Sequence, residues 1–249
     1  MAGHSKWANI KHRKAAVDKK RGKEFSKIAR AIIAAARAGG GNPEDNLSLR
    51  LPLERARAAN MPRDTVERAI KRGTGALGGD EFAPATYEAY GPGGAGILIQ
   101  ALTDNANRTV PEIRSALEKR GGTLGKPGSV AWNFEQKALV TVAADAVAEE
   151  ALLEIALEAG ADDVVREGDT YSITAPPDGY GALVAALASA SIEAKTSDVT
   201  YLPKSQVLLD PDAARRMVLL IESLEELEDV QSAITNADIP EEVLREIHA

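Results

Sequence analysis

The chain has 249 residues and a formal net charge of −7, with 44% hydrophobic and 27% charged residues. This length fits one large domain or two to three small ones, and the composition is typical of a folded, soluble protein. No apolar run approaches the ~18 residues of a membrane-spanning helix, which argues against a membrane protein. The absence of cysteine excludes disulfides, thiolate metal sites and a cysteine nucleophile.

The net charge conceals two regions of opposite charge. Residues 1–75 contain 18 Lys and Arg against 7 Asp and Glu, a net charge of +11. Residues 76–249 contain 12 against 30, a net charge of −18. Such asymmetry indicates a polyanion-binding arm on an acidic body. The alternative is that the cations merely solvate a helical surface.

The basic start also has the charge of a transit peptide, because such peptides are rich in arginine and poor in acids. It has no apolar core near the start, however, and serine is scarce. We therefore interpret Met1 as the start of the mature protein and expect a cytoplasmic location.

Three helices are predicted in the first part of the chain. Apolar residues recur at helical spacing from Phe25 to Ala36, and the glycines at 39–41 end that helix. We expect a second helix from about residue 43, with Asn42 as its N-cap and with Pro52 kinking it or resetting its start. A third helix is expected over 62–72.

The pattern then changes from helix to strand. Residues 86–90 and 96–103 read as two strands of a hairpin joined by the glycine-rich turn 91–94. Thr109 begins a capping box that predicts a helix N-terminus there. A third strand is expected over 129–134.

Residues 138–202 repeat a β-α-β-β-α-β order, which is the ferredoxin-like arrangement. After them come one helix, near 210–224, and one strand, near 230–234. So few elements cannot easily bury a core alone, but they complete the earlier hairpin and helix.

The expected fold is therefore multi-domain α+β: an N-terminal three-helix domain followed by two ferredoxin-like α+β domains, one inserted in the other. The expected boundaries are 1–79 for the basic helical domain, 80–137 plus 205–249 for a discontinuous α+β domain, and 138–204 for the inserted ferredoxin-like domain.

Catalytic machinery is not visible in the sequence. Gly91–Gly96 fits G-x-G-x-x-G, but a strand follows it where phosphate capture needs a helix N-terminus. Gly121–Lys126 resembles a P-loop with one residue too few between its glycines, and Pro127 replaces the metal-binding hydroxyl residue. The three histidines lack metal-ligand spacing. We predict no enzyme activity, no catalytic residue, no metal and no cofactor.

The informative stretch is GHSKWANIKHRKAAVDKKRGK, residues 3–23, which we call the basic arm. Its cations can neutralise phosphates, and an indole can stack on an unpaired base at ~1–3 kcal/mol; Trp7 has the alternative role of anchoring the arm to the protein. The candidate nucleic-acid-binding residues are Lys6, Trp7, Lys11, His12, Arg13, Lys14, Lys19, Lys20, Arg21 and Lys23.

A possible second patch lies in the turn from Asp104 to Thr109. Its asparagines, Asn105 and Asn107, have the simple alternative role of forming the turn and cap. Arg108 stands beside a predicted helix N-terminus, where it could help to hold a phosphate.

Several segments resemble the YebC/PmpR family. They are MAGHSKWANIKHRKAAVDKKRGKEFSKIAR (1–30), GGGNPEDN (39–46), YEAYGPGG (87–94), LTDNANRT (102–109), GGTLGKPGSVAWNF (121–134), EAGADDV (158–164) and EDVQ (228–231). The likeness covers essentially the whole chain. Pro52 departs from the helix-forming residue of the family pattern, and SAITNADI (232–239) lacks the aromatic residue that follows EDVQ.

The resemblance implies three domains, one helical and two α+β, and a transcriptional regulator that binds DNA. Relatives that include a mitochondrial activator of cytochrome oxidase subunit translation imply work on the ribosome instead, binding rRNA or tRNA and relieving stalling at proline runs. An enzyme acting on nucleic acid is a third, weaker interpretation. The expected partner is thus nucleic acid, either DNA or ribosomal RNA, with no membrane and no small-molecule substrate. Between oligomeric states we favour a monomer.

Overall fold

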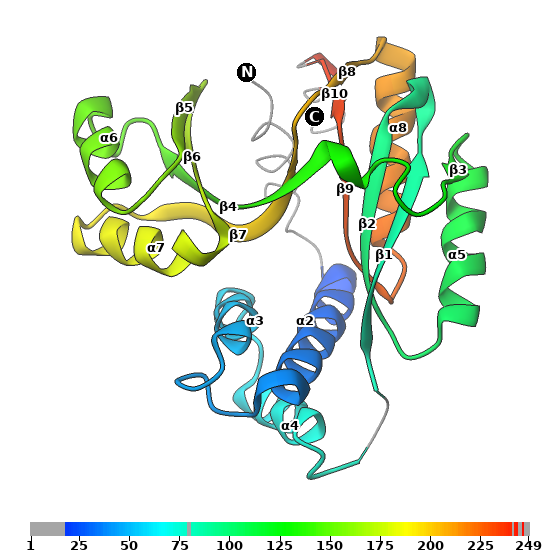
Figure 1. The fold of residues 1–249 in the computed structure, drawn as a ribbon, viewed down its shortest axis with the longest axis horizontal. Coiled ribbons are helices and arrows are strands. Elements are labelled where there is room, and N and C mark those ends of the chain that lie inside the picture. Colours follow the sequence, from blue (N-terminus) through cyan, green and yellow to red (C-terminus); the bar gives the residue numbers. More distant parts are fainter. Residues whose placement is uncertain (1–17, 79–80, 241, 244–245, 247–249) are drawn as a thin grey trace. The chain divides into compact units, whose positions relative to one another are not determined.

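The computed structural model describes residues 18–78, 81–240, 242–243 and 246; for residues 18–21 and 47 it describes the backbone only. The chain divides into two compact units (Figure 1). The first contains the described residues up to Ala131 together with Val207–Ala237, and the second contains Trp132–Gln206 with the described residues from Asp238 on.

The first unit begins with three helices, α2 (Asp18–Gly39), α3 (Leu47–Ala58) and α4 (Arg63–Gly73). They bury a core of Ile28, Ile32, Ile33, Ala36, Leu49, Ala56, Met61 and Ala69. The crossing of α2 and α4 is close because Gly73 has no side chain. A Cβ at Gly73 would lie 2.5 Å from the Ile33 carbonyl oxygen and 2.7 Å from the Ala36 Cβ.

The start of α3 corrects the prediction of a helix from residue 43. Asn42 forms a turn instead, in which its Oδ1 accepts from the Glu44 amide at 3.2 Å. Asn46 is buried, and its side chain donates to the carbonyl oxygens of Ala35 and Gly40 at 2.8 and 2.7 Å. This contact with the end of α2 fixes Asn46 in an extended conformation, so α3 begins only after it. Pro52 lies inside α3 without ending it.

The first unit also contains a four-stranded antiparallel sheet with the order β3-β1-β2-β9. Its strands are β1 (Ala83–Tyr90), β2 (Gly96–Thr103), β3 (Thr123–Leu124) and β9 (Val230–Thr235), and its helices are α5 (Ala106–Glu118) and α8 (Pro211–Glu225). The predicted hairpin of β1 and β2 is confirmed, with a short 3-10 turn, η1 (Pro92–Gly94), between the strands. The buried core is Ile97, Ile99, Ile113, Leu117, Met217, Leu220, Ile221 and Leu224. A small two-stranded sheet pairs β8 (Val207–Leu208) with β10 (Ala237–Asp238).

Two predicted details of this region are wrong. The helix begins at Ala106 with Asn105 as its N-cap, and Thr109 lies one turn inside, where its hydroxyl donates to Asp229. Residues 129–134 are not a strand of this sheet: Ala131–Asn133 form a 3-10 turn, η2. The reason is that the Glu88 carboxylate accepts from the amides of Val130 and Ala131, which are then unavailable to a strand partner.

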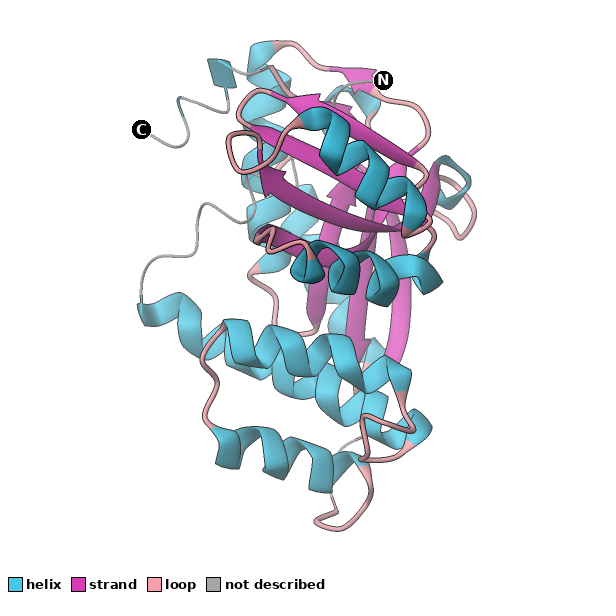
Figure 2. Cartoon of the chain, turned by 90° about the vertical axis from the view of Figure 1, so that its left-hand side faces the viewer, coloured by secondary structure: helices cyan, strands magenta, loops and turns pink. Residues whose placement is uncertain are grey.

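The second unit has the predicted β-α-β-β-α-β order. Its elements are β4 (Phe134–Ala143), α6 (Glu149–Glu158), β5 (Asp163–Glu167), β6 (Thr170–Ala175), the 3-10 turn η3 (Pro177–Gly179), α7 (Tyr180–Ser189) and β7 (Ala194–Pro203). The strands form an antiparallel sheet with the order β5-β6-β4-β7. Figure 2 shows α6 and α7 side by side across one face of this sheet.

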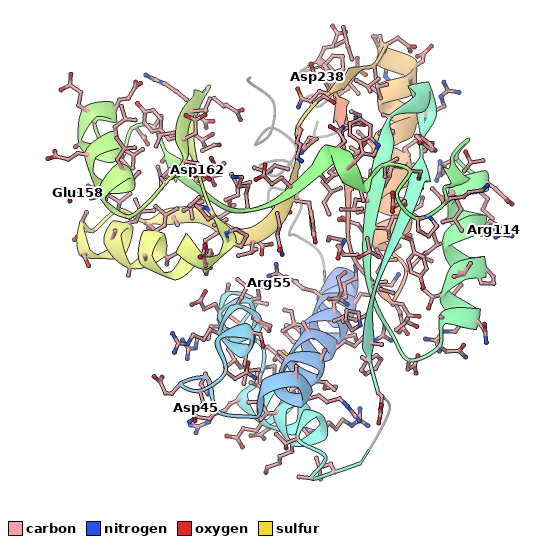
Figure 3. The ribbon with its side chains drawn as sticks, in the orientation of Figure 1. Asp45, Arg55, Arg114, Glu158, Asp162 and Asp238 are labelled. Carbon is pink, nitrogen blue, oxygen red and sulfur yellow. The ribbon has the colours of Figure 1, made fainter. Side chains whose placement is uncertain are left out.

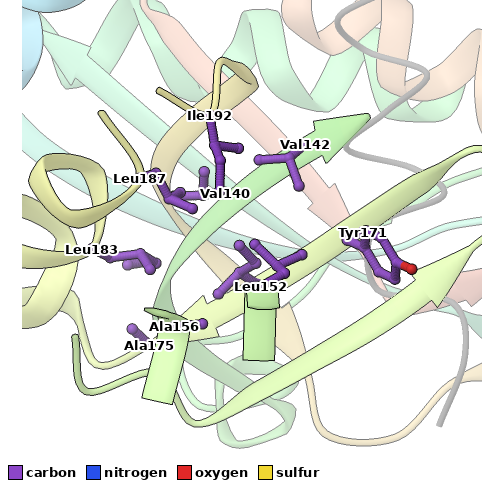
Figure 4. Packing of buried hydrophobic residues seen from close by; sticks show 11 residues of the cluster. Val140, Val142, Leu152, Ala156, Tyr171, Ala175, Leu183, Leu187 and Ile192 are labelled. Atoms are coloured by element: carbon purple, nitrogen blue, oxygen red, sulfur yellow. The ribbon is translucent and has the colours of Figure 1, made fainter. Parts of the chain in front are cut away.

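The core of the second unit lies between those helices and one face of the sheet (Figure 4). Val140, Val142 and Ile173 point inward from the strands, and Leu152 and Leu183 meet them from the helices. The sequence alternation of β4 fits this arrangement, since alternate residues point to the same face.

The chain is therefore an α+β protein of several structural parts, with N-terminal helices followed by two four-stranded antiparallel sheets that each carry two helices. Pairing between β4 and β7 already begins at Phe134 opposite Pro203. The three-domain division at 79, 137 and 204 stays a prediction.

Candidate nucleic-acid interface

Most of the basic arm lies outside the described residues, including Lys6, Trp7, Lys11, His12, Arg13 and Lys14. Lys19, Lys20 and Arg21 belong to the first turn of α2, whose backbone is helical. Lys23 is exposed, and its ammonium group donates to the backbone carbonyl of Glu226 at 3.4 Å. The end of the arm is thus part of a helix, and Lys23 remains accessible from solvent.

The next two cations of α2 make internal contacts. The Lys27 ammonium donates to the Glu225 carbonyl at 2.6 Å. The Arg30 guanidinium donates to Asp229 at 2.8 Å and to Glu228 at 3.0 Å, and it lies 5.2 Å from the centre of the Phe82 ring. These contacts attach α2 to the turn between α8 and β9.

A row of exposed cations lies along α4. Arg68, Lys71 and Arg72 are exposed, and their spacing places them on one face of the helix. None of their side chains has a hydrogen-bond or ion-pair partner within the described part of the chain. The sequence did not single out these residues, which contribute only to the net charge of residues 1–75. A short row of cations on a helix is also the ordinary pattern of a solvated face. We call these three residues the α4 row.

Asp229 is the centre of a buried polar cluster. Its side chain is 1% exposed and accepts from Arg30 at 2.8 Å, from Arg108 at 2.8 Å, and from the Thr109 hydroxyl at 2.6 Å. The Thr103 hydroxyl lies 3.3 Å from the same carboxylate. The cluster therefore joins α2, β2 and α5 through one carboxylate.

The electrostatics of Asp229 follow from these contacts. Burial raises the pKa of this carboxyl, but the hydrogen bonds from Thr109 and Arg108 and the charges of Arg108 and Arg30 outweigh burial and hold its pKa below the ordinary value. Burial raises the pKa of the Tyr87 phenol, and the Asp229 charge adds to that rise. Asp229 is therefore ionised at neutral pH and acts as a fixed counter-charge for two arginines.

Two residues of the predicted second patch, Asn105 and Arg108, have structural roles within the protein. The Asn105 side chain accepts from the Arg108 amide at 3.3 Å as the N-cap of α5, and Asn107 is exposed. The Arg108 guanidinium donates to Asp104 at 2.7 Å and to Asp229 at 2.8 Å, and both carboxylates raise its pKa. A phosphate would have to compete with two carboxylates for Arg108. Nothing in the local sequence pattern pointed to Asp229 as its partner, 121 positions away.

Figure 3 shows how the side chains cover the elements, with Arg55 on α3 and Arg114 on α5 among those labelled. Across the described residues, no group of three or more His, Asp or Glu side chains is arranged to hold a metal ion. Within the same part of the chain, no helix combines the length and the apolar character of a membrane span.

The fold and the charge distribution define a multi-domain α+β protein with basic N-terminal helices, and comparison with known proteins gives its family. The model of the TACO1/YebC protein N-terminal domain matches residues 5–76, and the model of the TACO1/YebC second and third domain matches residues 82–237. The chain belongs to the TACO1/YebC family, as the resemblance in its motifs predicted.

Similar proteins match along the whole chain. A "Probable transcriptional regulatory protein" of Maridesulfovibrio salexigens is 48% identical over 247 residues, which cover 99% of each chain. A protein of the same description from Idiomarina loihiensis is 48% identical over 246 residues, 98% of each chain. The crystal structure of the conserved hypothetical protein Aq1575 from Aquifex aeolicus is similar with a TM-score of 0.85 at 44% identity, covering 95% of this chain and 98% of that one.

Proposed function

We propose that this protein is a non-enzymatic nucleic-acid-binding regulatory factor, and that it is a DNA-binding transcriptional regulator acting through its basic arm. The observation that carries the proposal is the concentration of a net charge of +11 in residues 1–75 of a chain whose remainder has −18. The name shared by the relatives, probable transcriptional regulatory protein, supports the regulatory part.

The physical basis is the release of counterions from the nucleic-acid backbone. Each Lys or Arg that neutralises a phosphate releases condensed cations, which gives affinity without sequence specificity. The arm supplies eight Lys and Arg between Lys6 and Lys23. The α4 row adds three more exposed cations on a rigid helix. The acidic body as a whole would be repelled by the same backbone, so the basic region would supply most of the contact.

The second candidate is a ribosome-associated translation factor that binds rRNA or tRNA and relieves stalling at proline runs. The observation that favours it is Trp7, which stands among the cations of the arm. An indole gains stacking energy on unpaired bases, which are common in RNA loops and absent from intact duplex DNA. Under either candidate we propose a cytoplasmic monomer that needs no cofactor.

The test compares the full chain with a variant lacking residues 1–22. Duplex DNA and single-stranded RNA of equal length are titrated by fluorescence anisotropy, and ribosome co-sedimentation is measured in a sucrose gradient. We expect the full chain to bind and the shortened chain to lose most of its affinity. Ribosome association that survives excess duplex DNA would select the translation factor, whereas a reproducible footprint on one promoter would select the transcription factor. Failure of the full chain to bind any of these would refute the proposal.

A further inference from the structure

A second basic segment lies within the acidic part of the chain. Residues 119–134 contain Lys119, Arg120 and Lys126 but no Asp or Glu, although residues 76–249 as a whole carry −18. All three cations are exposed. Their side chains have no hydrogen-bond or ion-pair partner in the described residues. By contrast, Arg108 nearby in sequence is bound to two carboxylates. The three side chains are therefore available to a ligand.

The fold places these cations along one edge of the first sheet. α5 ends at Glu118, and β3 then forms the outer strand of the sheet, with Thr123 opposite Tyr90. Arg120 precedes β3 by three positions and Lys126 follows its first residue by three. At about 3.3–3.6 Å per extended residue, the two Cα atoms are at most about 20 Å apart. Phosphates of one strand are spaced at about 3.4 Å along a duplex axis, so within this limit both cations can contact the same strand.

The loop after β3 is held in one conformation by Glu88. The Glu88 carboxylate is buried and accepts from the amides of Gly128, Val130 and Ala131 at 2.6, 2.6 and 2.8 Å. The Gly125 amide donates to the Glu88 carbonyl at 2.7 Å. These bonds fix both ends of the segment that carries Lys126.

The charge state of Glu88 supports this role. Burial raises the pKa of the Glu88 carboxyl, but the hydrogen bonds from the three backbone amides outweigh burial and hold the pKa below its ordinary value. The Tyr90 hydroxyl donates to the Ser129 carbonyl at 3.0 Å, while 39% of the Tyr90 surface stays exposed beside the loop. An ionised carboxylate inside the loop thus satisfies its amides at neutral pH.

This arrangement also excludes a phosphate loop of the nucleotide-binding kind. Such loops bind anions with backbone amides, and here three of those amides already donate to Glu88. What remains for an anion is the side-chain charge of Lys119, Arg120 and Lys126, on a backbone that needs little ordering when a ligand binds. Contacts of this kind suit the regular phosphates of a polymer more than a single nucleotide.

We propose that Lys119, Arg120 and Lys126 form a second phosphate-contact surface for nucleic acid, separate from the basic arm, with Glu88 fixing its loop. The inference rests on the proposed nucleic-acid-binding function and adds a named contact surface to it. The surface recognises backbone charge, so it contributes affinity to duplex and single strands alike and no base specificity.

The experiment uses the full chain with Lys119→Glu, Arg120→Glu and Lys126→Glu combined. The control combines Lys195→Glu, Lys204→Glu and Arg216→Glu, three exposed cations elsewhere in the acidic part, so that both variants change the net charge equally. Anisotropy titrations with duplex DNA and with single-stranded RNA are repeated over a salt series. At about 0.9 per phosphate on duplex and about 0.7 on single strands, we expect the log-log salt slope to flatten by about two to three. Affinity at low salt should fall at least about tenfold relative to the control, as expected for the loss of two or more phosphate contacts.

Alanine at the same three positions removes charge without adding repulsion, and it should flatten the slope by a similar amount. A loop variant that binds like its control, with an unchanged slope, would overturn the inference. If Lys11→Glu, Arg13→Glu and Lys14→Glu then still weaken binding, the proposed function stands without this surface. If the unaltered chain binds no nucleic acid at all, the proposed function fails and the inference fails with it.

Discussion

Replacing Asp229 by asparagine tests whether the buried cluster joins α2 to the sheet of the first unit. The substitution keeps the size of a side chain that is 1% exposed but removes the charge that faces Arg30 and Arg108. The amide nitrogen would also point a donor at the Thr109 hydroxyl or at a guanidinium, where the carboxylate now accepts. We therefore expect a large loss of stability from a single-atom change.

The size of that loss follows from the burial of the ion pair between Asp229 and Arg30. Removing one partner of a fully buried ion pair costs about 3–5 kcal/mol. The Arg30 side chain is 14% exposed and keeps Glu228 as a partner, so we take the lower end, about 3 kcal/mol. At about 2–4 °C per kcal/mol for a protein of this size, the melting temperature of the first unit should fall by roughly 6–12 °C.

Stability is measured by chemical denaturation and by thermal melting, with circular dichroism as the readout of both. Glu228→Gln is the matched control, because it removes the same charge from the neighbouring residue, which is 69% exposed and also pairs with Arg30. An exposed ion pair contributes about 0–1 kcal/mol. Equal destabilisation by the two variants would refute the claim that Asp229 is the centre of the cluster.

Two further predictions concern the same unit. Because its folded pKa lies below its ordinary value, Asp229 should stabilise the fold fully above about pH 4, the unfolded pKa. This contribution should then be lost as the pH falls through the folded pKa. The difference in unfolding free energy between wild type and Asp229→Asn should therefore narrow in acid. A difference that stays constant with pH would contradict this prediction. Gly73→Ala should destabilise by about 1–3 kcal/mol, because the added Cβ would meet the Ile33 carbonyl at 2.5 Å. Gly22→Ala, in the same helical region with nothing within 4 Å of its added Cβ, should instead stabilise by up to about 1 kcal/mol, and both values come from urea denaturation.

The regular elements could be predicted from the sequence where periodicity and turn residues agree. The β-α-β-β-α-β order of 138–202 and the hairpin at 91–94 are examples, and both are confirmed. Errors arose where a side-chain contact outside the local sequence pattern decides the structure. Glu88 takes the amides of the expected strand at 129–134, and Asn46 delays the start of α3. Local sequence propensity cannot predict such contacts, because neither residue of a pair has a distinctive pattern in the sequence.

The candidate site, too, could be predicted only in part from the sequence. The sequence locates the basic arm, since charge is additive and needs no structure to be counted. It could not show that Arg108 faces Asp229, or that Lys119, Arg120 and Lys126 stay unpaired beside a fixed loop. Which cations are already neutralised depends on long-range pairing. A count of charges along the chain therefore predicts the region that binds a polyanion better than the individual residues.

The central claim is that the basic arm binds nucleic acid through phosphate neutralisation. The most direct test is the salt dependence of binding, measured for the unaltered chain and for Lys11→Glu, Arg13→Glu and Lys14→Glu combined. At about 0.7–0.9 per neutralised phosphate, the log-log slope should flatten by about two to three, and affinity should fall on every nucleic acid tested. Unchanged affinity for DNA, RNA and ribosomes, with an unchanged slope, would remove the arm from the mechanism.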